Sequence, residues 1–183
     1  MPELPEITAY IRALKHRVLG QVVEAVRIRT PSLLKTFDPR VSELEGRRVM
    51  EVRRVGKRIV FELEGGFFAV IHLMISGRLS WKEKGASIPK KRGHAAFDFS
   101  NGTLLLTEAS THKRASLWVV RGEEALAALD PGGIEPLEVD YSDFRDALLR
   151  ENRTLKRALT DPKILSGIGN AHSDEILLRA RLS

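Results

Sequence analysis

The chain has 183 residues, with 30 Lys and Arg against 24 Asp and Glu, so its net charge is +6, and it contains no cysteine. These features exclude disulfides and thiolate metal sites, and no apolar run reaches the roughly 18 residues that a membrane-spanning helix needs. A pI of about 9.8 favours a polyanionic partner such as nucleic acid, and the five histidines are too scattered for a zinc motif.

The chain begins with a predicted helix. Apolar residues recur at spacings of three and four over residues 4–18, and Gly20 ends this pattern. Pro5 suits the first helical turn, and Glu6 places a negative charge near the positive end of the helix dipole. Because Glu3 and Glu6 stand where a secretory signal would carry cations, we expect a cytoplasmic protein.

Short β-branched and aromatic runs follow, with turn residues rather than helices between them. They predict strands over 22–28, 47–55, 58–64, 67–75, 95–99, 103–107 and 115–120. Gly65-Gly66 and Asn101-Gly102 supply the positive φ angles of tight hairpins, which favours antiparallel pairing. We therefore predict an α+β fold in which the N-terminal helix packs on an antiparallel β-sandwich.

A segment rich in turn formers divides the chain. Residues 131–140 predict a linker between a β-sandwich domain over 1–130 and a partial helical domain over 141–183. Two or three short helices provide a meagre core, so we expect the helical domain to be incomplete.

Three helices are predicted in this last part of the chain. The first covers 143–151 with Ser142 as its N-cap, and the second covers 154–161. The third has Asn170 or Ser173 as its cap and runs to Ser183.

The first residues also suggest chemistry. If Met1 is removed, Pro2 carries the α-amino group, whose pKa of about 8 lies below the value of about 10.4 for lysine, so more of it is neutral and nucleophilic. A secondary amine that condenses with a sugar aldehyde carbon gives a permanently cationic iminium. Glu3 and Glu6 are the nearest acids. Proline and glutamate are also good helix-start residues, so the residues alone leave both interpretations open.

Four motifs together resemble the formamidopyrimidine-DNA glycosylase / endonuclease VIII family. They are MPELPEI at the start, VGKRIVFELEG (55–65), VIHLMISGRL (70–79) and LSGIGNAHSDEIL (165–177), the last of which resembles the family's helix–two-turn–helix element. The resemblance implies a base-excision-repair DNA glycosylase and AP lyase that removes oxidised bases and cleaves the abasic strand through a Schiff base. Its partner would be damaged double-stranded DNA. The protein would act as a monomer at the nucleoid and would not bind a membrane.

The resemblance also implies individual roles. Pro2 would be the nucleophile, Glu3 the proton donor, Lys57 the lysine beside the nucleophile, and Glu6 a residue of the damaged-base pocket. The residues expected to contact DNA are His72, Ile75, Arg78, His94, Lys113, Arg114, Lys156 and Asn170. For each of these the ordinary alternative is a structural role, as a solvated cation, an interior histidine or a helix cap.

The sequence departs from the family pattern in three ways. Ile75 stands where the family has a gap-filling methionine, with Met74 expected on the opposite face of a strand. The stretch 109–115 reads ASTHKRA in place of an arginine–phenylalanine loop, so Lys113 and Arg114 supply charge without an aromatic. The family's C-terminal zinc ribbon is absent, so the chain looks truncated and we expect no cofactor in it.

Two alternatives to the enzyme remain open. A damaged-DNA-binding relative with weak or no catalysis would fit the altered loop and the missing C-terminal part. A proline-amine tautomerase would also use a terminal proline, but that class follows it with a strand, whereas a helix is predicted here.

Overall fold

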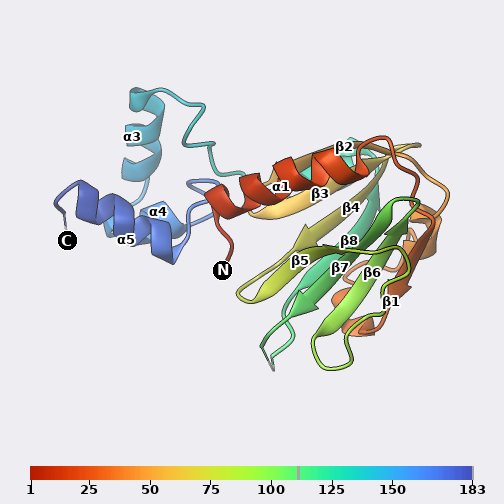
Figure 1. The fold of residues 1–183 in the computed structure, drawn as a ribbon. Helices are drawn as coiled ribbons and strands as arrows, with labels where there is room; N and C mark the ends of the chain where they lie inside the picture. The colour runs from red at the N-terminus through yellow and green to blue at the C-terminus, as the bar shows by residue number, and fades with distance from the viewer. Residues whose placement is uncertain (111, 183) are drawn as a thin grey trace.

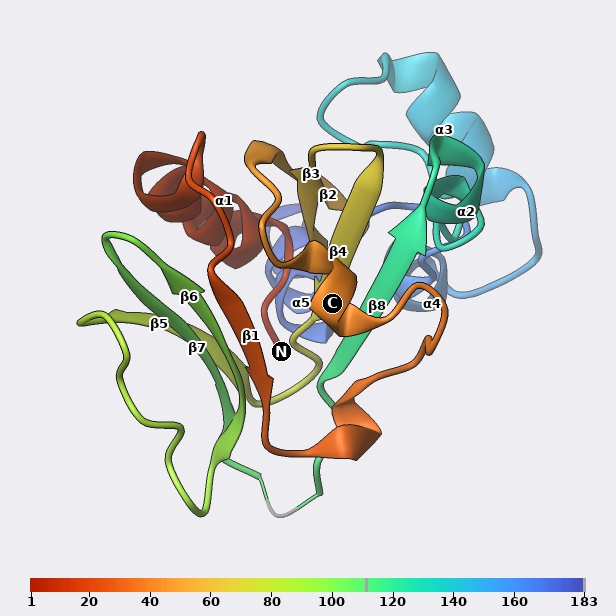
Figure 2. The same cartoon turned by 90° about the vertical axis from the view of Figure 1, so that its right-hand side faces the viewer.

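The chain folds into a β-sandwich with a helical unit at one end. The computed structural model describes residues 1–110 and 112–182. Helix α1 (Leu4–Val18) lies along the sandwich, and the remaining long helices gather beyond its N-terminal end (Figures 1 and 2). Among the described residues, no helix is both long and apolar enough to cross a membrane.

Two four-stranded sheets form the sandwich. The first, in the order β1–β6–β7–β5, contains β1 (Ala25–Ile28), β5 (Gly77–Lys82), β6 (Gly93–Phe99) and β7 (Gly102–Glu108). The second, in the order β2–β3–β4–β8, contains β2 (Val49–Val55), β3 (Arg58–Leu63), β4 (Phe67–His72) and β8 (Ser116–Arg121). Every pairing between these strands is antiparallel. Both predicted glycine hairpins form, β3–β4 and β6–β7, and the predicted fold class is confirmed.

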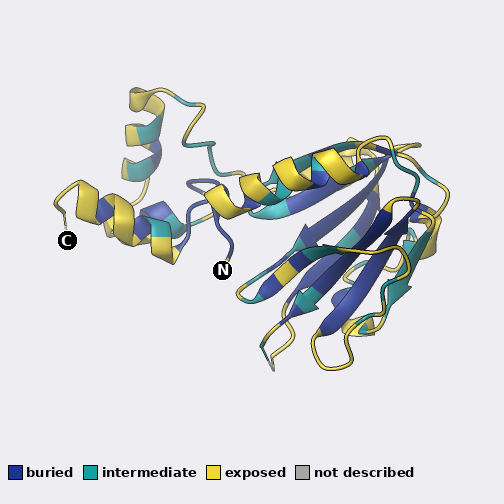
Figure 3. Cartoon of the chain, in the orientation of Figure 1, coloured by how far each residue is buried: buried dark blue, intermediate teal, exposed yellow. Residues whose placement is uncertain are grey.

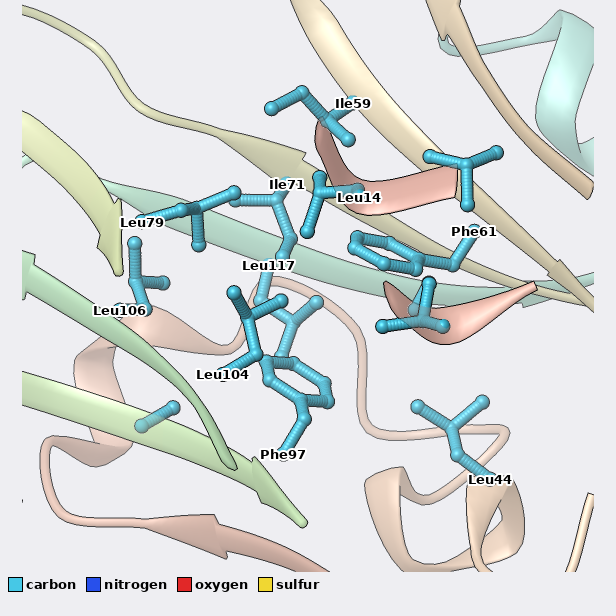
Figure 4. Packing of buried hydrophobic residues seen from close by; sticks show 14 of the residues in the cluster. Leu14, Leu44, Ile59, Phe61, Ile71, Leu79, Phe97, Leu104, Leu106 and Leu117 are labelled. Carbon is cyan, nitrogen blue, oxygen red and sulfur yellow. The ribbon is translucent and has the colours of Figure 1, made fainter. Parts of the chain in front are cut away.

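Apolar side chains from both sheets and from α1 fill the space between the layers. Phe61 and Phe97 stack across it with ring centroids 6.4 Å apart, and Leu104 and Leu117 lie beside the Phe97 ring (Figure 4). Leu14 is one of the α1 side chains that enter this core, while the outer face of α1 is exposed (Figure 3). Each fully buried side chain of this kind stabilises the fold by about 1.5–3 kcal/mol.

A second apolar layer covers the outer face of the β2–β3–β4–β8 sheet. It includes Phe68 and Val70 of β4 and Leu126 of the short helix α2 (Glu123–Ala127). The sequence patterns did not predict α2, because one turn of helix is too short to show periodicity.

The turn between β4 and β5 differs from the prediction of one strand over 67–75. β4 ends at His72, residues 73–76 form a turn, and β5 begins at Gly77. A Cβ on Gly77 would lie 2.2 Å from the carbonyl oxygen of Leu73, so the chain can turn this sharply only with glycine there. Met74, whose φ is 52°, and Ile75 therefore occupy a turn and not opposite faces of a strand.

The helical unit has a small core of its own. It contains α3 (Tyr141–Leu149), α4 (Leu155–Thr160) and α5 (Asn170–Arg179). Its buried side chains are Ala147, Ala158, Leu159, Ile164, Leu165, Ile168 and Leu177.

The ends of these helices differ from the predicted ends. Asp140, not Ser142, caps α3, because its side chain accepts a hydrogen bond from the Asp143 backbone N–H at 2.9 Å. Gly169 is the N-cap of α5, so neither Asn170 nor Ser173 has that position. The last helix, α5, ends at Arg179 and does not run to Ser183 as predicted; Ser183 itself lies outside the described residues.

The segment 131–140 is attached to the helical unit through Gly133 and Ile134. The backbone N–H of Ile134 donates to the backbone carbonyl of Ile164 at 3.0 Å. The backbone N–H of Ser166 donates to the carbonyl of Ile134 at 2.8 Å. Arg54 of β2 adds a link to the sandwich, because its guanidinium pairs with Glu135 and donates to the Ser166 hydroxyl at 3.2 Å. These bonds hold the helical unit against the sandwich.

We expect Arg54→Ala to loosen this attachment. Loss of a hydrogen-bonded ion pair costs about 1–3 kcal/mol, and hydrogen exchange at the amides of Ile134 and Ser166 should accelerate accordingly. The matched control is Arg53→Ala, which removes the neighbouring guanidinium from its surface pair with Glu123. Equal acceleration in both variants, or none in Arg54→Ala, would contradict the role of Arg54.

Candidate active site

The first residues of the chain lie between the sandwich and the helical unit. Figure 1 shows the N-terminus there, and both Pro2 and Glu3 are buried, Glu3 to 2% exposure. The backbone N–H of Glu3 donates to Oε2 of Glu6 at 2.9 Å, an N-terminal cap of α1. The next N–H, of Leu4, donates to the carbonyl of Gly167 at 2.9 Å. The start of α1 is thus joined directly to the loop that precedes α5.

The Glu3 carboxylate binds the N-terminus of α5. It accepts backbone N–H groups from Gly169 at 2.8 Å, Ala171 at 3.1 Å and His172 at 3.1 Å, and its Oε2 lies 2.7 Å from Nδ1 of His172. Burial acts to raise the pKa of Glu3, but the hydrogen bonds from His172, Gly169 and Ala171 outweigh it and hold the pKa below its usual value. Four donors and the helix dipole therefore favour the ionised carboxyl.

Lys57 lies in the β2–β3 turn, and its side chain also approaches Gly169 at the start of α5. A Cβ built on Gly169 would lie 2.4 Å from Oε1 of Glu3 and 2.9 Å from Nζ of Lys57, so both charged groups meet above this glycine. Burial lowers the pKa of Lys57, and the nearby charge of Glu3 opposes this only in part. The Lys57 amine thus loses its proton more readily than an exposed lysine does.

Two glycines of the GIG stretch make this approach possible. Gly169 leaves no room for a side chain between Glu3 and Lys57, and Gly167, at a φ of 81°, brings its backbone against Leu4. In the sequence both belong to the motif LSGIGNAHSDEIL, which gave neither of them a role of its own. No local pattern marks these glycines, because the residues that they face, Glu3, Leu4 and Lys57, lie far away in the sequence.

A cavity of about 280 Å³ opens beside these groups, with Met1, Lys57, Arg58, His72 and Gly167 among its lining residues. Burial lowers the pKa of His72 to about 4, and the positive charges of Arg58 and Lys57 add to this effect. The imidazole of His72 is therefore neutral at neutral pH. Its Nε2 is buried and has no partner among the described residues, so it can serve a molecule that enters the cavity.

Other predicted site residues lie exposed at the same end of the sandwich. Ile75 is 55% exposed at the tip of the β4–β5 turn, and Arg78 is exposed two residues after that turn. Lys113 and Arg114 are exposed in the loop between β7 and β8, which lies against the turn because the Ser110 backbone N–H donates to the Ser76 hydroxyl at 3.3 Å. The structure thus brings Ile75, Arg78, Lys113 and Arg114 to one edge. The predicted loop 109–115 also includes residue 111, which lies outside the described residues.

His94 does not join this edge. It is 1% exposed, and its Nε2 lies 2.9 Å from Oε2 of Glu108, which is equally buried. The same carboxylate accepts the backbone N–H groups of Arg114 at 2.9 Å and Ala115 at 3.2 Å. The prediction that His94 contacts DNA directly disagrees with this position, because the ring does not reach the surface. His94 instead supports Glu108, which holds the loop and which sequence reasoning missed.

Lys156 and Asn170 are exposed on the helical unit. Nζ of Lys156 in α4 lies 2.5 Å from a carboxylate oxygen of Asp174 in α5, and Asn170 is the first residue of α5. They stand on the same two helices that approach the start of the chain. Glu6 is also exposed, and its carboxylate caps α1.

The described residues contain no cluster of three or more His, Asp or Glu side chains that could hold a metal ion. The sequence has no cysteine, so a cysteine-ligated zinc ribbon is not part of these 183 residues.

Comparison with known proteins gives one consistent family. The profile of the formamidopyrimidine-DNA glycosylase N-terminal domain matches residues 1–114. The formamidopyrimidine-DNA glycosylase of Heliobacterium modesticaldum is 36% identical over 190 aligned residues, covering 100% of this chain and 68% of that protein. The enzyme of the same name from Mycoplasma genitalium is 30% identical and is covered to 66%. The chain thus spans about two thirds of the length of these relatives.

Solved structures agree with this result. A complex of the Lactococcus lactis Fpg with DNA containing an abasic site is similar, with a TM-score of 0.85 and 26% identity over 96% of this chain and 65% of that one. A MutM complex with DNA containing carbocyclic 8-oxo-G has a TM-score of 0.85 and 28% identity, with 96% and 67% covered.

A β-sandwich in which the buried Glu3 meets a lysine and the start of a helix in a separate helical unit is shared with DNA glycosylases of known structure. The chain belongs to the formamidopyrimidine-DNA glycosylase family.

The proximity of Lys57 and Glu3 has a measurable consequence. Glu3→Gln removes the negative charge that opposes the burial of Lys57, so we expect the pKa of Lys57 to fall further, as followed by NMR titration of its side chain. Glu6→Gln is the matched control, because its carboxylate bonds to the Glu3 backbone and is not a cause of the Lys57 shift. An unchanged Lys57 titration in Glu3→Gln would contradict the described geometry.

Proposed function

We propose that this protein is a base-excision-repair DNA glycosylase and AP lyase that acts on oxidised bases through a Schiff base on Pro2. The observation that carries the proposal is that Glu3, which follows the buried Pro2, meets Lys57 over Gly169. Support also comes from relatives named formamidopyrimidine-DNA glycosylase and from similar structures that hold DNA with an abasic site or with 8-oxo-G.

In the proposed reaction, the lone pair of the Pro2 amine forms a bond to the sugar C1′ while the bond from C1′ to the base breaks, and the base leaves with the proton that the Pro2 nitrogen loses. A proton from Glu3 then lets the ring C1′–O4′ bond open, which leaves a cationic iminium between Pro2 and the sugar. The iminium draws electrons as a neighbouring proton is lost, so the adjacent phosphate leaves and the strand is cut. Lys57 lies beside Glu3, where it can contact a phosphate or assist elimination.

The reaction needs the free amine of Pro2. With Met1 present, the Pro2 nitrogen is an amide and has no nucleophilic lone pair. Met1 lines the cavity beside Lys57 and His72, so its removal would enlarge that cavity next to the nitrogen. The unpartnered Nε2 of His72 would then face the entering DNA.

DNA would lie across the exposed end of the sandwich and the helical unit. We propose that Ile75 fills the gap left by the everted nucleotide, while Arg78, Lys113 and Arg114 contact the backbone from the sandwich side. Lys156 and the backbone near Asn170 would hold phosphate from the helical side. Glu6 would stand at the edge of the base pocket through its contact with Glu3.

These assignments divide the chain into a catalytic domain over 1–130, a linker over 131–140 and part of a helix–two-turn–helix domain over 141–183. A basic chain whose substrate is chromosomal DNA would act in the cytoplasm at the nucleoid, as a single copy on the duplex. A separate core in the helical unit supports the division.

A damaged-DNA-binding relative without efficient catalysis is the second candidate. The observation in its favour is the β7–β8 loop, where Lys113 and Arg114 are exposed without an aromatic neighbour. Such a protein would bind abasic duplex DNA and form no covalent bond with it.

Borohydride trapping on abasic duplex DNA separates the two candidates. We expect the protein with Met1 removed, as verified by intact mass, to form a covalent adduct that Pro2→Gly reduces strongly. Glu3→Gln should slow base excision by about a hundredfold or more, because it removes the general acid. Tight binding without an adduct, by protein that has lost Met1, would favour the binding relative instead.

The role of Ile75 can be tested on two substrates. Ile75→Ala should slow excision of an oxidised purine, because the wedge supports base eversion, and should affect a preformed abasic site much less. Met50→Ala is the matched control, since Met50 is 54% exposed, much as Ile75 is, but lies on β2. Equal effects of Ile75→Ala on both substrates would count against the wedge.

A further inference from the structure

One side chain contacts the proposed acid and has no role in the scheme above. His172, in the first turn of α5, touches Glu3 twice, with its backbone N–H at 3.1 Å and its ring Nδ1 at 2.7 Å, both to Oε2. The backbone N–H would be there whatever the side chain. The ring contact depends on histidine and is therefore specific to this residue type.

The imidazole of His172 spans the distance from a buried group to solvent. The side chain of Glu3 is 3% exposed, whereas that of His172 is 35% exposed. On its outer side His172 lines an open groove with Ala171, Glu175, Ile176 and Arg179. The ring is thus a polar path between the buried carboxyl and the solvent.

The charged groups around this pair come from three elements. Lys57 of the β2–β3 turn faces Glu3, and the carboxylate of Glu6 in α1 binds the Glu3 backbone. On α5 itself, Glu175 and Arg179 face the outer side of His172. His172 therefore has both an acidic and a basic side chain near it, whereas the Glu3 carboxylate is surrounded mainly by hydrogen-bond donors.

We propose that His172 is a positioning residue that holds the Glu3 carboxyl in place and carries protons between it and solvent. This inference rests on the proposed role of Glu3 as the proton donor. When Glu3 gives its proton to the sugar ring oxygen, the resulting carboxylate takes the proton of Nδ1, and Nε2 takes one from water on the outer side. One solvent proton enters for each proton delivered, and no other bond changes.

This relay would supply Glu3 with a proton that its surroundings otherwise disfavour. Three backbone N–H groups and a helix N-terminus favour the ionised form of Glu3, which has no proton to give. Histidine is the side chain type that ordinarily exchanges its proton near neutral pH. In a hydrogen-bonded carboxyl–imidazole pair, the transferable proton belongs to the pair as a whole.

Two substitutions of His172 separate its role in holding the Glu3 carboxyl from its role in proton transfer. In His172→Asn a side-chain amide N–H can replace Nδ1 as donor but does not titrate, and in His172→Phe both donor and proton are lost. His16→Asn, at an exposed histidine of α1, is the matched control. The measurement is single-turnover excision of an oxidised purine from duplex DNA as a function of pH, with the protein freed of Met1.

We expect His172→Phe to slow excision by about tenfold or more at all pH values. His172→Asn should approach the wild-type rate in acid, but its alkaline limb should shift to lower pH, because Glu3 alone must then hold the proton. His16→Asn should match the wild type. A wild-type profile in both His172 variants would overturn the proposal, and a wild-type profile in His172→Asn alone would overturn the relay.

A second measurement does not depend on activity. The hydrogen bond from His172 helps to lower the pKa of Glu3, so the Glu3 carboxyl, followed by carbon NMR, should titrate at higher pH in His172→Phe and close to wild type in His172→Asn. An unchanged titration in His172→Phe would overturn the proposal even if the enzyme is active. An inactive wild-type protein with the expected titrations would instead overturn the proposed function and leave the Glu3–His172 link standing.

Discussion

The structure depends on one residue, Glu3, that joins the starts of two helices. Glu3 caps the start of α1 through its own backbone, while its side chain accepts the N–H groups at the start of α5. Two helix N-termini, each with unsatisfied donors and a partial positive charge, would repel each other if brought together without an anion. The carboxylate makes their approach favourable, and through it the sandwich and the helical unit meet at the first residues of the chain.

The arrangement of the candidate site follows from this contact between the sandwich and the helical unit. Pro2 is carried into the interior because the residue after it is fixed, and Lys57 arrives from a turn between two paired strands. The hydrogen bonds of Glu3 and the pairing of β2 with β3 thus hold Pro2, Glu3 and Lys57 in fixed relative positions. The pKa values of Glu3, Lys57 and His72 are all lowered, but for different reasons: hydrogen-bond donors favour the ionised form of Glu3, whereas burial disfavours the charged forms of Lys57 and His72, and nearby positive charges add to this at His72.

Much of the fold could be predicted from the sequence because its signals are local. The helix periodicity after Leu4 and the glycine hairpins at Gly65-Gly66 and Asn101-Gly102 each depend on neighbouring residues alone. The β4–β5 turn was missed because its sharpness depends on the contact between Gly77 and Leu73, which no pattern of hydrophobicity reveals.

The site was predictable only in part, for the same physical reason. Motif resemblance pointed to Glu3 and Lys57, whose proximity the structure shows. It could not reveal that Gly169 provides the space between them, or that His94 is paired in the interior with Glu108, because these depend on residues far apart in the chain.

The bonds between the β4–β5 turn and the β7–β8 loop have a mechanical consequence. Ser76, next to Ile75, contacts both the Glu108 carboxylate, at 3.4 Å, and the backbone of Ser110. Glu108 in turn holds the backbone of Arg114. A force applied to the tip of the turn therefore reaches the cationic loop through a short chain of polar contacts. Any displacement of Ile75 must either carry Arg114 with it or break these contacts. The β4–β5 turn and the β7–β8 loop therefore move as one unit.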